Sequence, residues 1–505
     1  MKKTKLTALL AGMLAMGILV GGCGGDADKN GKVLKVGGTV SVISQMDPAK
    51  DWDGWYIVRY GVGETLFKID KDGKAQPWLA EKLENINPTT WKLTIKDNVT
   101  FSNGEKMTAD KVIASLKRTA EMNKRAVYLQ GATFTAEGNV ITIKTEKPAA
   151  GLMDNLCDPY STILDVAGTK DFANNPIATG PFMMKSLEAN KKAVMVKNPK
   201  YWGGEVKTDQ VEYMVVADQN MLTMALKSGE IDIAQDLNAT SAAALANENK
   251  IKVETVTQPR VTQVYFNLEK MQDKAVREAI MYGIDKTSIG ANTLKGGTVA
   301  AYAGTPDGTV YAASNLKPHM FDAERAKKVL ADAGYKDTNG DGIVEKGGKP
   351  LQIKLSYYKR ASLETISTEM QAQLKAIGIA IEIIPHEKAN YFAAGDYEMG
   401  LYYVVTAPTG ELTPFLRDNL RIGGKANFGR YSNPTVERIF DELDGTFDMD
   451  KRIALTNQVQ QIIIDDAAMD YIGFNTLHVG MNKEVTGYEL SANDYYQMTK
   501  DTAKK

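Results

Sequence analysis

The sequence has few of the residues that build disulfide frameworks and metal centres. Cysteine occurs twice in 505 residues, at Cys23 and Cys157, and histidine occurs three times, at His319, His386 and His478. These counts exclude a disulfide-rich scaffold and a cysteine zinc site, and they leave little room for a histidine-rich metal site. We therefore expect no resident metal held by such residues.

An excess of charge of either sign is also lacking. The chain carries 61 lysines and arginines against 62 aspartates and glutamates, a formal net charge of −1. Nucleic acid is therefore not an expected partner, because phosphate binding needs a basic excess or a basic face. A hydrophobic fraction of 43% and a charged fraction of 24% are typical of a folded globular protein. The length suggests roughly two to four domains.

The longest apolar run lies near the N-terminus and is too short to cross a bilayer as a helix. It covers residues 6–20, after three lysines within the first five residues, whereas a spanning helix needs roughly 20 apolar residues. This pattern predicts a secretory signal over residues 1–22 and a flexible tether over residues 23–32. The small residues before Cys23 resemble a bacterial lipobox, which implies lipidation of Cys23 and a membrane anchor. A plain signal peptide with an incidental cysteine is the alternative.

The rest of the chain alternates strand and helix patterns, which indicates an α/β fold. Residues 108–122 carry apolar side chains at helical spacing, with Thr108 as the N-cap. Residues 351–355, 362–377 and 379–384 predict a strand–helix–strand unit. No proline- or serine-rich linker separates independent domains, so we expect lobes that the chain crosses more than once.

Short catalytic motifs are absent from the sequence. There is no Gly-x-Ser-x-Gly, no phosphate-binding loop ending in Gly-Lys-Ser/Thr and no His-Glu-x-x-His. Cys157 has no histidine near it in sequence and is expected to be a small buried apolar side chain. These absences favour a binding protein over an enzyme.

One loop resembles a calcium-binding sequence. Asp337, Asn339 and Asp341 supply oxygens at positions 1, 3 and 5 of an EF-hand-like loop, and Gly342 stands at position 6. Position 12 is Gly348, where an EF-hand needs a bidentate glutamate. A hairpin turn built on Asn-Gly and Asp-Gly is the alternative. We expect no cofactor, with calcium at this loop as the one option left open.

Several short segments occur in an order typical of one protein family. They are GETLF at 63–67, PWLA at 77–80, VTFSNGE at 99–105, ATGPF at 178–182, NPKYWG at 198–203 and FDAERA at 321–326. Over residues 31–490 the chain resembles the extracytoplasmic solute-binding lipoproteins of ABC importers, in the peptide/nickel/opine cluster known as solute-binding protein family 5.

The resemblance implies a two-lobe, periplasmic-binding-protein-like α/β fold of type II with an extra subdomain in the first lobe. Lobe I would hold residues 31–258 plus 478–505, with the extra subdomain at about 76–180, and lobe II would hold residues 259–477. Solute would lie between lobes that close over it. The family implies no catalysis, a monomer, delivery to ABC permease and ATPase subunits, and an exported protein that is lipid-anchored to the bacterial membrane, facing the periplasm or cell exterior.

The resemblance also implies a type of solute. Peptide-binding relatives anchor the peptide amine on an aspartate where this chain has Pro408, and Ala407-Pro408 matches the nickel-binding relatives, in which arginines grip the carboxylates of a chelator. We therefore expect a small peptide-like, opine or metal-chelate (nickel-type) solute. The expected ligand-binding residues are Trp55, Tyr56, Arg125, Thr406, Thr409, Glu411 and Arg421.

Two alternatives remain open at this point. Glu411 would replace the missing aspartate in an oligopeptide- or dipeptide-binding lipoprotein of a peptide importer. A non-transport surface protein or an enzyme on the same fold would not deliver solute to a permease. A further alternative is that Arg125 and Arg421 are solvated surface charges. Trp55 and Tyr56 would then be side chains that pack within a lobe.

Overall fold

The computed structural model describes residues 32–39, 44–50, 54–493 and 495–505, which belong to one structural unit, Lys32–Lys505. The predicted signal, nearly all of the tether and the Cys23 lipidation site lie outside the described residues. Within the described ranges, no helix combines the length and the apolar character needed to span a bilayer.

A large mixed sheet organises the described chain. Its eleven strands follow the order β17-β16-β18-β12-β19-β11-β1-β10-β9-β8, and β13 pairs with β19 beside that path. The strands of this sheet are β1 (Val33–Gly38), β8 (Phe182–Glu188), β9 (Lys192–Lys197), β10 (Gln210–Val215), β11 (Ile233–Leu237), β12 (Ile251–Phe266), β13 (Thr298–Ala300), β16 (Gln352–Tyr358), β17 (Ala380–His386), β18 (Met399–Val405) and β19 (Met469–Asn482).

A second, smaller sheet of the described chain is antiparallel and lies within the region expected as the extra subdomain. It has the order β4-β5-β7-β6, from β4 (Ala80–Asn87), β5 (Thr90–Ile95), β6 (Thr133–Glu137) and β7 (Val140–Lys144). The remaining described strands form hairpin-like pairs: β2 (Phe67–Ile69) with β3 (Ala75–Pro77), β14 (Glu345–Lys346) with β15 (Lys349–Pro350), and β20 (Val485–Thr486) with β21 (Ala503–Lys504).

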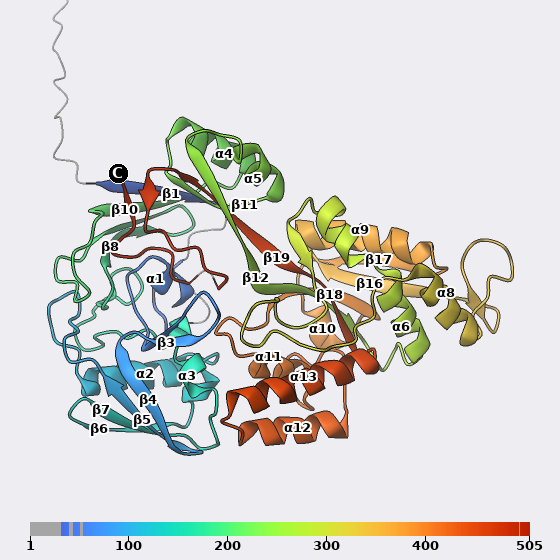
Figure 1. Cartoon of the computed structure of the whole chain (residues 1–505), viewed down its shortest axis with the longest axis horizontal. Coiled ribbons are helices and arrows are strands. Elements are labelled where there is room, and N and C mark those ends of the chain that lie inside the picture. Colours follow the sequence, from blue (N-terminus) through green and yellow to red (C-terminus); the bar gives the residue numbers. More distant parts are fainter. Residues whose placement is uncertain (1–31, 40–43, 51–53, 494) are drawn as a thin grey trace, which may run out of the picture. The chain divides into compact units, whose positions relative to one another are not determined.

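Helices connect the strands and are mostly short (Figure 1). The α-helices are α1 (Gly54–Arg59), α2 (Ala109–Met122), α3 (Leu152–Asn155), α4 (Gln219–Ser228), α5 (Ala239–Leu245), α6 (Lys274–Gly283), α7 (Lys286–Ser288), α8 (Ala323–Asp332), α9 (Ala361–Lys375), α10 (Tyr391–Ala394), α11 (Thr413–Leu420), α12 (Pro434–Asp444) and α13 (Met449–Asp465). Single turns of other helix types occur at η1 (Val127–Leu129), η2 (Pro159–Ser161) and η3 (Ile289–Thr293).

Local sequence signals explain several of these elements. Helix α2 begins after Thr108, whose side chain accepts a hydrogen bond from the backbone N–H of Lys111, as an N-cap does. The predicted strand–helix–strand unit is present as β16, α9 and β17, with β16 and β17 parallel. Cys157 is fully buried in an apolar core, as expected. The sequence predictions for these parts are confirmed.

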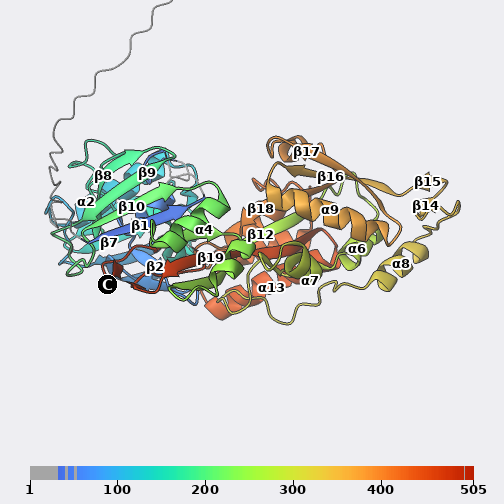
Figure 2. The same ribbon diagram turned by 90° about the horizontal axis from the view of Figure 1, so that it is seen from above.

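The longest strands, β12 and β19, lie side by side (Figures 1 and 2), and their antiparallel pairing runs from Ile251 to Tyr265 with two irregularities. The larger irregularity, the break in β12, is a register shift between Thr257 and Val261, and a second shift follows between Thr262 and Gln263. Buried apolar side chains form separate cores around this break. One core uses residues 34–213, 233 and 477–498, a smaller one uses residues 222–251, and two others use only residues 261–474.

Candidate ligand site

The break in β12 is held by the end of the neighbouring strand β18. Pro259 lies in the break and has no backbone N–H for a strand ladder. Its carbonyl oxygen accepts two hydrogen bonds from Thr406, at 2.8 Å from the backbone nitrogen and 3.2 Å from the hydroxyl. Thr406, one of the expected site residues, therefore fixes the chain that leaves β18 against the point where β12 changes register.

Two arginines and two aromatic side chains meet beside this break. The guanidinium of Arg260, in β12, lies 5.8 Å from the ring centre of Trp55 in α1 and 5.7 Å from that of Tyr403 in β18. The guanidinium of Arg360, between β16 and α9, lies 3.9 Å from the same Tyr403 ring. We call Trp55, Arg260, Arg360 and Tyr403 the arginine–aromatic cluster. These distances are those of cation–π contacts.

The two positive charges of the cluster lack a carboxylate partner. Among the described residues, no aspartate or glutamate lies within ion-pair distance of Arg260 or Arg360, whereas Arg118 and Arg417 each have one. Like charges on one ring repel each other, and an anion between them would relieve that repulsion. The cluster is therefore suited to a ligand with carboxylates, which a planar guanidinium binds through two parallel hydrogen bonds.

The aromatic members of the cluster add hydrogen-bond donors. Burial raises the pKa of Tyr403 to about 12, against the opposing effect of the Arg260 and Arg360 charges. Its phenol is thus protonated at neutral pH and can donate a hydrogen bond. The indole Nε1 of Trp55 is buried and has no hydrogen-bond partner among the described residues. A ligand oxygen would satisfy this donor, and a buried donor left unpaired is costly.

The histidines of the chain do not gather near this cluster. The ring of His386 stacks on Tyr391 with ring centres 4.0 Å apart, and Nδ1 of His478 lies 2.9 Å from the hydroxyl of Thr255. His319 packs edge-on against Tyr282. The described chain has one group of three His, Cys, Asp or Glu side chains close enough to share an ion, on the loop after α8. Direct metal ligation at the arginine–aromatic cluster therefore has no support in the described residues.

Three of the other expected site residues are buried. Tyr56 is 3% exposed, packs edge-on against Tyr60 and lies under the guanidinium of Arg59. Glu411 is 3% exposed, forms an ion pair with Arg452 and accepts a hydrogen bond from the backbone of Thr413. Thr409, in the turn after β18, is also buried. Their known contacts are internal ones.

The two arginines expected from sequence lie in other surroundings. Arg125 is exposed, and its charge lowers the pKa of Asp158, which burial raises to about 7. Arg421 follows α11 and pairs with acidic side chains of α12: Asp441, Glu437 and Asp444. The structure thus brings Trp55 into the arginine–aromatic cluster and Thr406 beside it. Arg421 already has carboxylate partners from the protein.

Sequence reasoning missed Arg260, Arg360 and Tyr403. Arg260 directly follows the Gln258-Pro259 pair that was expected as a lobe crossing. Arg360 directly precedes the helix of the predicted strand–helix–strand unit, and ligands of open α/β sheets bind beyond the carboxyl ends of such strands. Both signals were present, but nothing local shows that residues 100 positions apart share the ring of Tyr403.

Comparisons with known proteins give one family and several long matches. Residues 74–419 match the family model of bacterial extracellular solute-binding proteins, family 5 middle. The nickel-binding protein NikA of Staphylococcus aureus is 27% identical over 492 residues, which cover 96% of this chain and 97% of that protein.

Solved structures give matches of similar length. The crystal structure of a nickel ABC transporter protein from Bacillus halodurans is 28% identical, with a TM-score of 0.81, and the match covers 93% of this chain and 100% of that one. NikA from Staphylococcus aureus, crystallised in complex with Ni(L-His)2, is 26% identical with a TM-score of 0.77, covering 94% of this chain and 100% of that one.

Proposed function

Because this chain belongs to the family 5 bacterial extracellular solute-binding proteins, we propose that its solute is a carboxylate-bearing metal chelate of the nickel–histidine type. The protein is a solute-binding component of an ABC importer, works outside the cytoplasm and is not an enzyme. The expected fold class, an α/β periplasmic-binding-protein fold with an added subdomain, is confirmed.

One observation carries the choice of solute. Arg260 and Arg360 share the ring of Tyr403 and have no carboxylate partner among the described residues. Two L-histidine chelators bring two carboxylates, which match two guanidiniums in charge and in hydrogen-bonding geometry. Trp55 supplies a further donor from α1. The chelator would then complete the metal's coordination, so no protein histidine is needed near the cluster.

The proposed capture involves two lobes and a hinge. We place lobe I at residues 32–258 plus 478–505 and lobe II at residues 259–477. The separate cores around the break in β12 support these boundaries. In this proposal Trp55 belongs to lobe I and the two arginines to lobe II, so a chelate bound by both sides favours the closed state.

The experiment that tests the solute is calorimetric titration of the purified chain. The titrants are nickel chloride alone, L-histidine alone, and nickel with two equivalents of L-histidine. Binding of the mixture that is at least tenfold tighter than binding of either component supports the proposal. Equal binding of nickel alone would instead indicate direct ligation by protein side chains and would contradict it.

The oligopeptide alternative makes a different prediction in the same assay. It needs Glu411 to hold a peptide amine, but Glu411 is already paired with Arg452 and buried. We therefore propose that a mixture of short peptides gives no heat of binding. A peptide that binds more tightly than the nickel–histidine mixture would establish the alternative.

We also propose that Cys23 carries the lipid anchor. The small residues before it and the short apolar run support this reading. The substitution Cys23→Ser should leave the precursor unprocessed and unlabelled when cells are fed radioactive fatty acid. Equal labelling of wild type and variant would exclude lipidation at this residue.

A further inference from the structure

The loop between α8 and β14 forms a closed turn. It is closed by paired backbone hydrogen bonds between Lys336 and Glu345, at 3.0 and 2.8 Å. Gly340 and Gly342 inside the loop have φ angles of 79° and 86°, a left-handed region that a side chain would strain. The loop is joined to the rest of the chain by a 2.9 Å hydrogen bond from Val344 to the carbonyl of Gly378.

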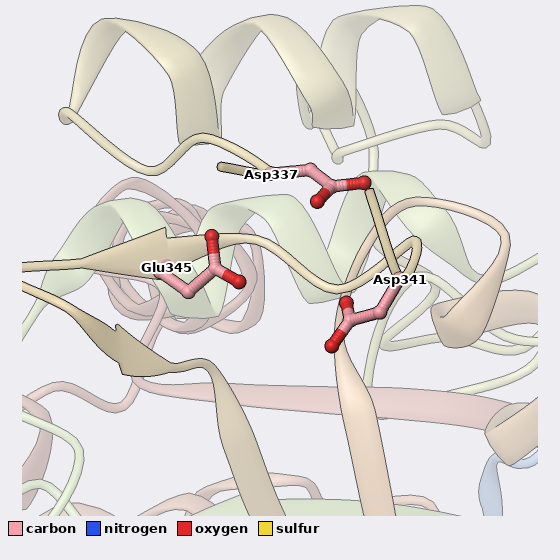
Figure 3. A group of neighbouring side chains, drawn as sticks. All are labelled: Asp337, Asp341 and Glu345. Atoms are coloured by element: carbon pink, nitrogen blue, oxygen red, sulfur yellow. The ribbon is translucent and has the colours of Figure 1, made fainter. Parts of the chain in front are cut away.

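Three carboxylates of this loop point toward a common space (Figure 3). One oxygen each from Asp337, Asp341 and Glu345 lies within 4.8 Å of the other two. Among the described residues, no lysine or arginine forms an ion pair with any of the three, and the neighbouring Lys346 pairs with Asp273 instead. Loop N–H groups donate hydrogen bonds to Asp337 and Asp341, but three like charges so close together still repel one another, and a cation between them would relieve that repulsion.

The side chain of Glu345 gives a second, independent indication that this loop binds a cation. Its side chain is only 7% exposed. Its Oε2 accepts hydrogen bonds from the backbone and the hydroxyl of Thr338, at 2.7 and 2.9 Å. Its Oε1 is buried and has no partner among the described residues. A buried carboxylate oxygen without a partner is costly and uncommon in folded proteins.

We propose that this loop binds one calcium ion through the carboxylates of Asp337, Asp341 and Glu345. Calcium accepts an all-oxygen set with irregular geometry, which suits three carboxylates from a nine-residue stretch. Glu345 then supplies the carboxylate that Gly348 cannot supply at position 12 of an EF-hand-like loop. Loop oxygens and water complete the coordination. The site is separate from the proposed solute site and does not depend on that proposal.

The affinity should be that of an extracellular calcium module. Such modules bind with dissociation constants of about 10⁻⁴–10⁻³ M. Magnesium demands a smaller, near-octahedral shell and parts with its water reluctantly, so this loop should bind it at least tenfold more weakly. Bound calcium would offset two of the three negative charges and tie the turn residues Asp337 and Asp341 to Glu345 at the start of β14.

The test is equilibrium dialysis of radioactive calcium against the whole chain after treatment with EDTA. We expect one equivalent bound, displaced by cold calcium but not by equal magnesium. Asp341→Asn, an exposed substitution of equal size, should weaken binding at least tenfold, and so should Glu345→Gln. Asp332→Asn is the matched control, because it removes an acidic side chain of α8 that pairs with Lys328, and it should bind calcium as wild type does.

Three outcomes would overturn the proposal. The first is no saturable binding up to about 10 mM calcium, which is ten times the largest dissociation constant expected. The second is equal affinity for magnesium, and the third is unchanged calcium binding by Asp341→Asn. Circular dichroism shows whether each variant is folded. If Glu345→Gln is unfolded, the exposed Asp341→Asn variant decides the question by itself.

Discussion

Arg260 and Arg360 differ from Arg118, Arg421 and Arg452 in having no carboxylate partner among the described residues. Arg118, Arg421 and Arg452 face carboxylates of the protein, whereas Arg260 and Arg360 face aromatic rings. A charged hydrogen bond is typically worth about 1.5–3 kcal/mol. Arg260→Ala or Arg360→Ala should therefore weaken binding of nickel–histidine roughly ten- to hundredfold in a calorimetric titration.

Arg421→Ala is the matched control for this prediction. Its guanidinium is paired with the carboxylates of α12, so its loss should leave the affinity within about a factor of two of wild type. Arg421 was expected from sequence to bind the ligand, so the three variants compare the two site assignments directly. Strong loss in Arg421→Ala with wild-type binding in the other two would favour the assignment made from sequence.

Glu411 should matter for folding more than for ligand binding. It and Arg452 form a buried ion pair, and removing one partner of such a pair costs about 3–5 kcal/mol because the other charge is left uncompensated. Glu411→Gln should therefore lower the melting temperature of the empty protein clearly. Glu442→Gln, which removes the α12 partner of an exposed ion pair with Lys451, serves as the control and should change stability by less than about 1 kcal/mol. Normal stability together with lost binding would instead support Glu411 as a ligand contact.

Elements with a complete local signal were predictable from the sequence. The strand–helix–strand unit and the start of α2 depend on periodicity and on a cap within a few residues, and both are present. The pairing of Arg421 with α12 was not predictable, because it depends on how α11 and α12 pack. The arginine–aromatic cluster joins α1, β12, β18 and the end of β16, so it is a product of the tertiary fold.

The cap of α2 gives a test at this scale. Thr108 accepts a hydrogen bond from the N–H of Lys111 at the first turn of the helix. Thr108→Ala should cost about 1 kcal/mol of local stability, which corresponds to roughly fivefold faster amide exchange at Lys111 and Val112, whose N–H groups bond to Thr108. Thr108→Asp, which keeps an acceptor, should exchange at nearly the wild-type rate. Unchanged exchange in the alanine variant would show that the cap contributes nothing.

At the scale of the whole molecule, we expect closure of the two proposed lobes to be coupled to protonation of Asp154. Asp154, in α3 of the proposed lobe I, lies close to Glu411 of the proposed lobe II, and a Cβ at Gly151 would come within 2.6 Å of Oε2 of Glu411. Burial, followed by the charge of Glu411, raises the pKa of Asp154 from 3.8 to about 7. If opening separates these side chains, Asp154 returns toward its ordinary pKa. A closed state that keeps this contact then holds the proton that the open state releases.

The sign of the resulting pH dependence follows from that difference. Between pH 4 and pH 7 the closed state binds more protons than the open state, so closure, and with it solute affinity, weakens as the pH rises toward 7. From pH 6 to pH 8 this one group should weaken binding by up to roughly tenfold. Asp154→Asn has no proton to lose and should remove that contribution.

The measurement is the affinity for nickel–histidine at pH 6 and pH 8, for wild type and for Asp154→Asn. The chelate titrates over the same range, but the ratio of variant to wild-type affinity at each pH cancels its contribution. That ratio should rise by up to roughly tenfold from pH 6 to pH 8, because only wild type loses affinity through Asp154. A constant ratio would mean that Asp154 keeps the same pKa in both states. The contact between α3 and Glu411 would then persist when the protein releases its solute.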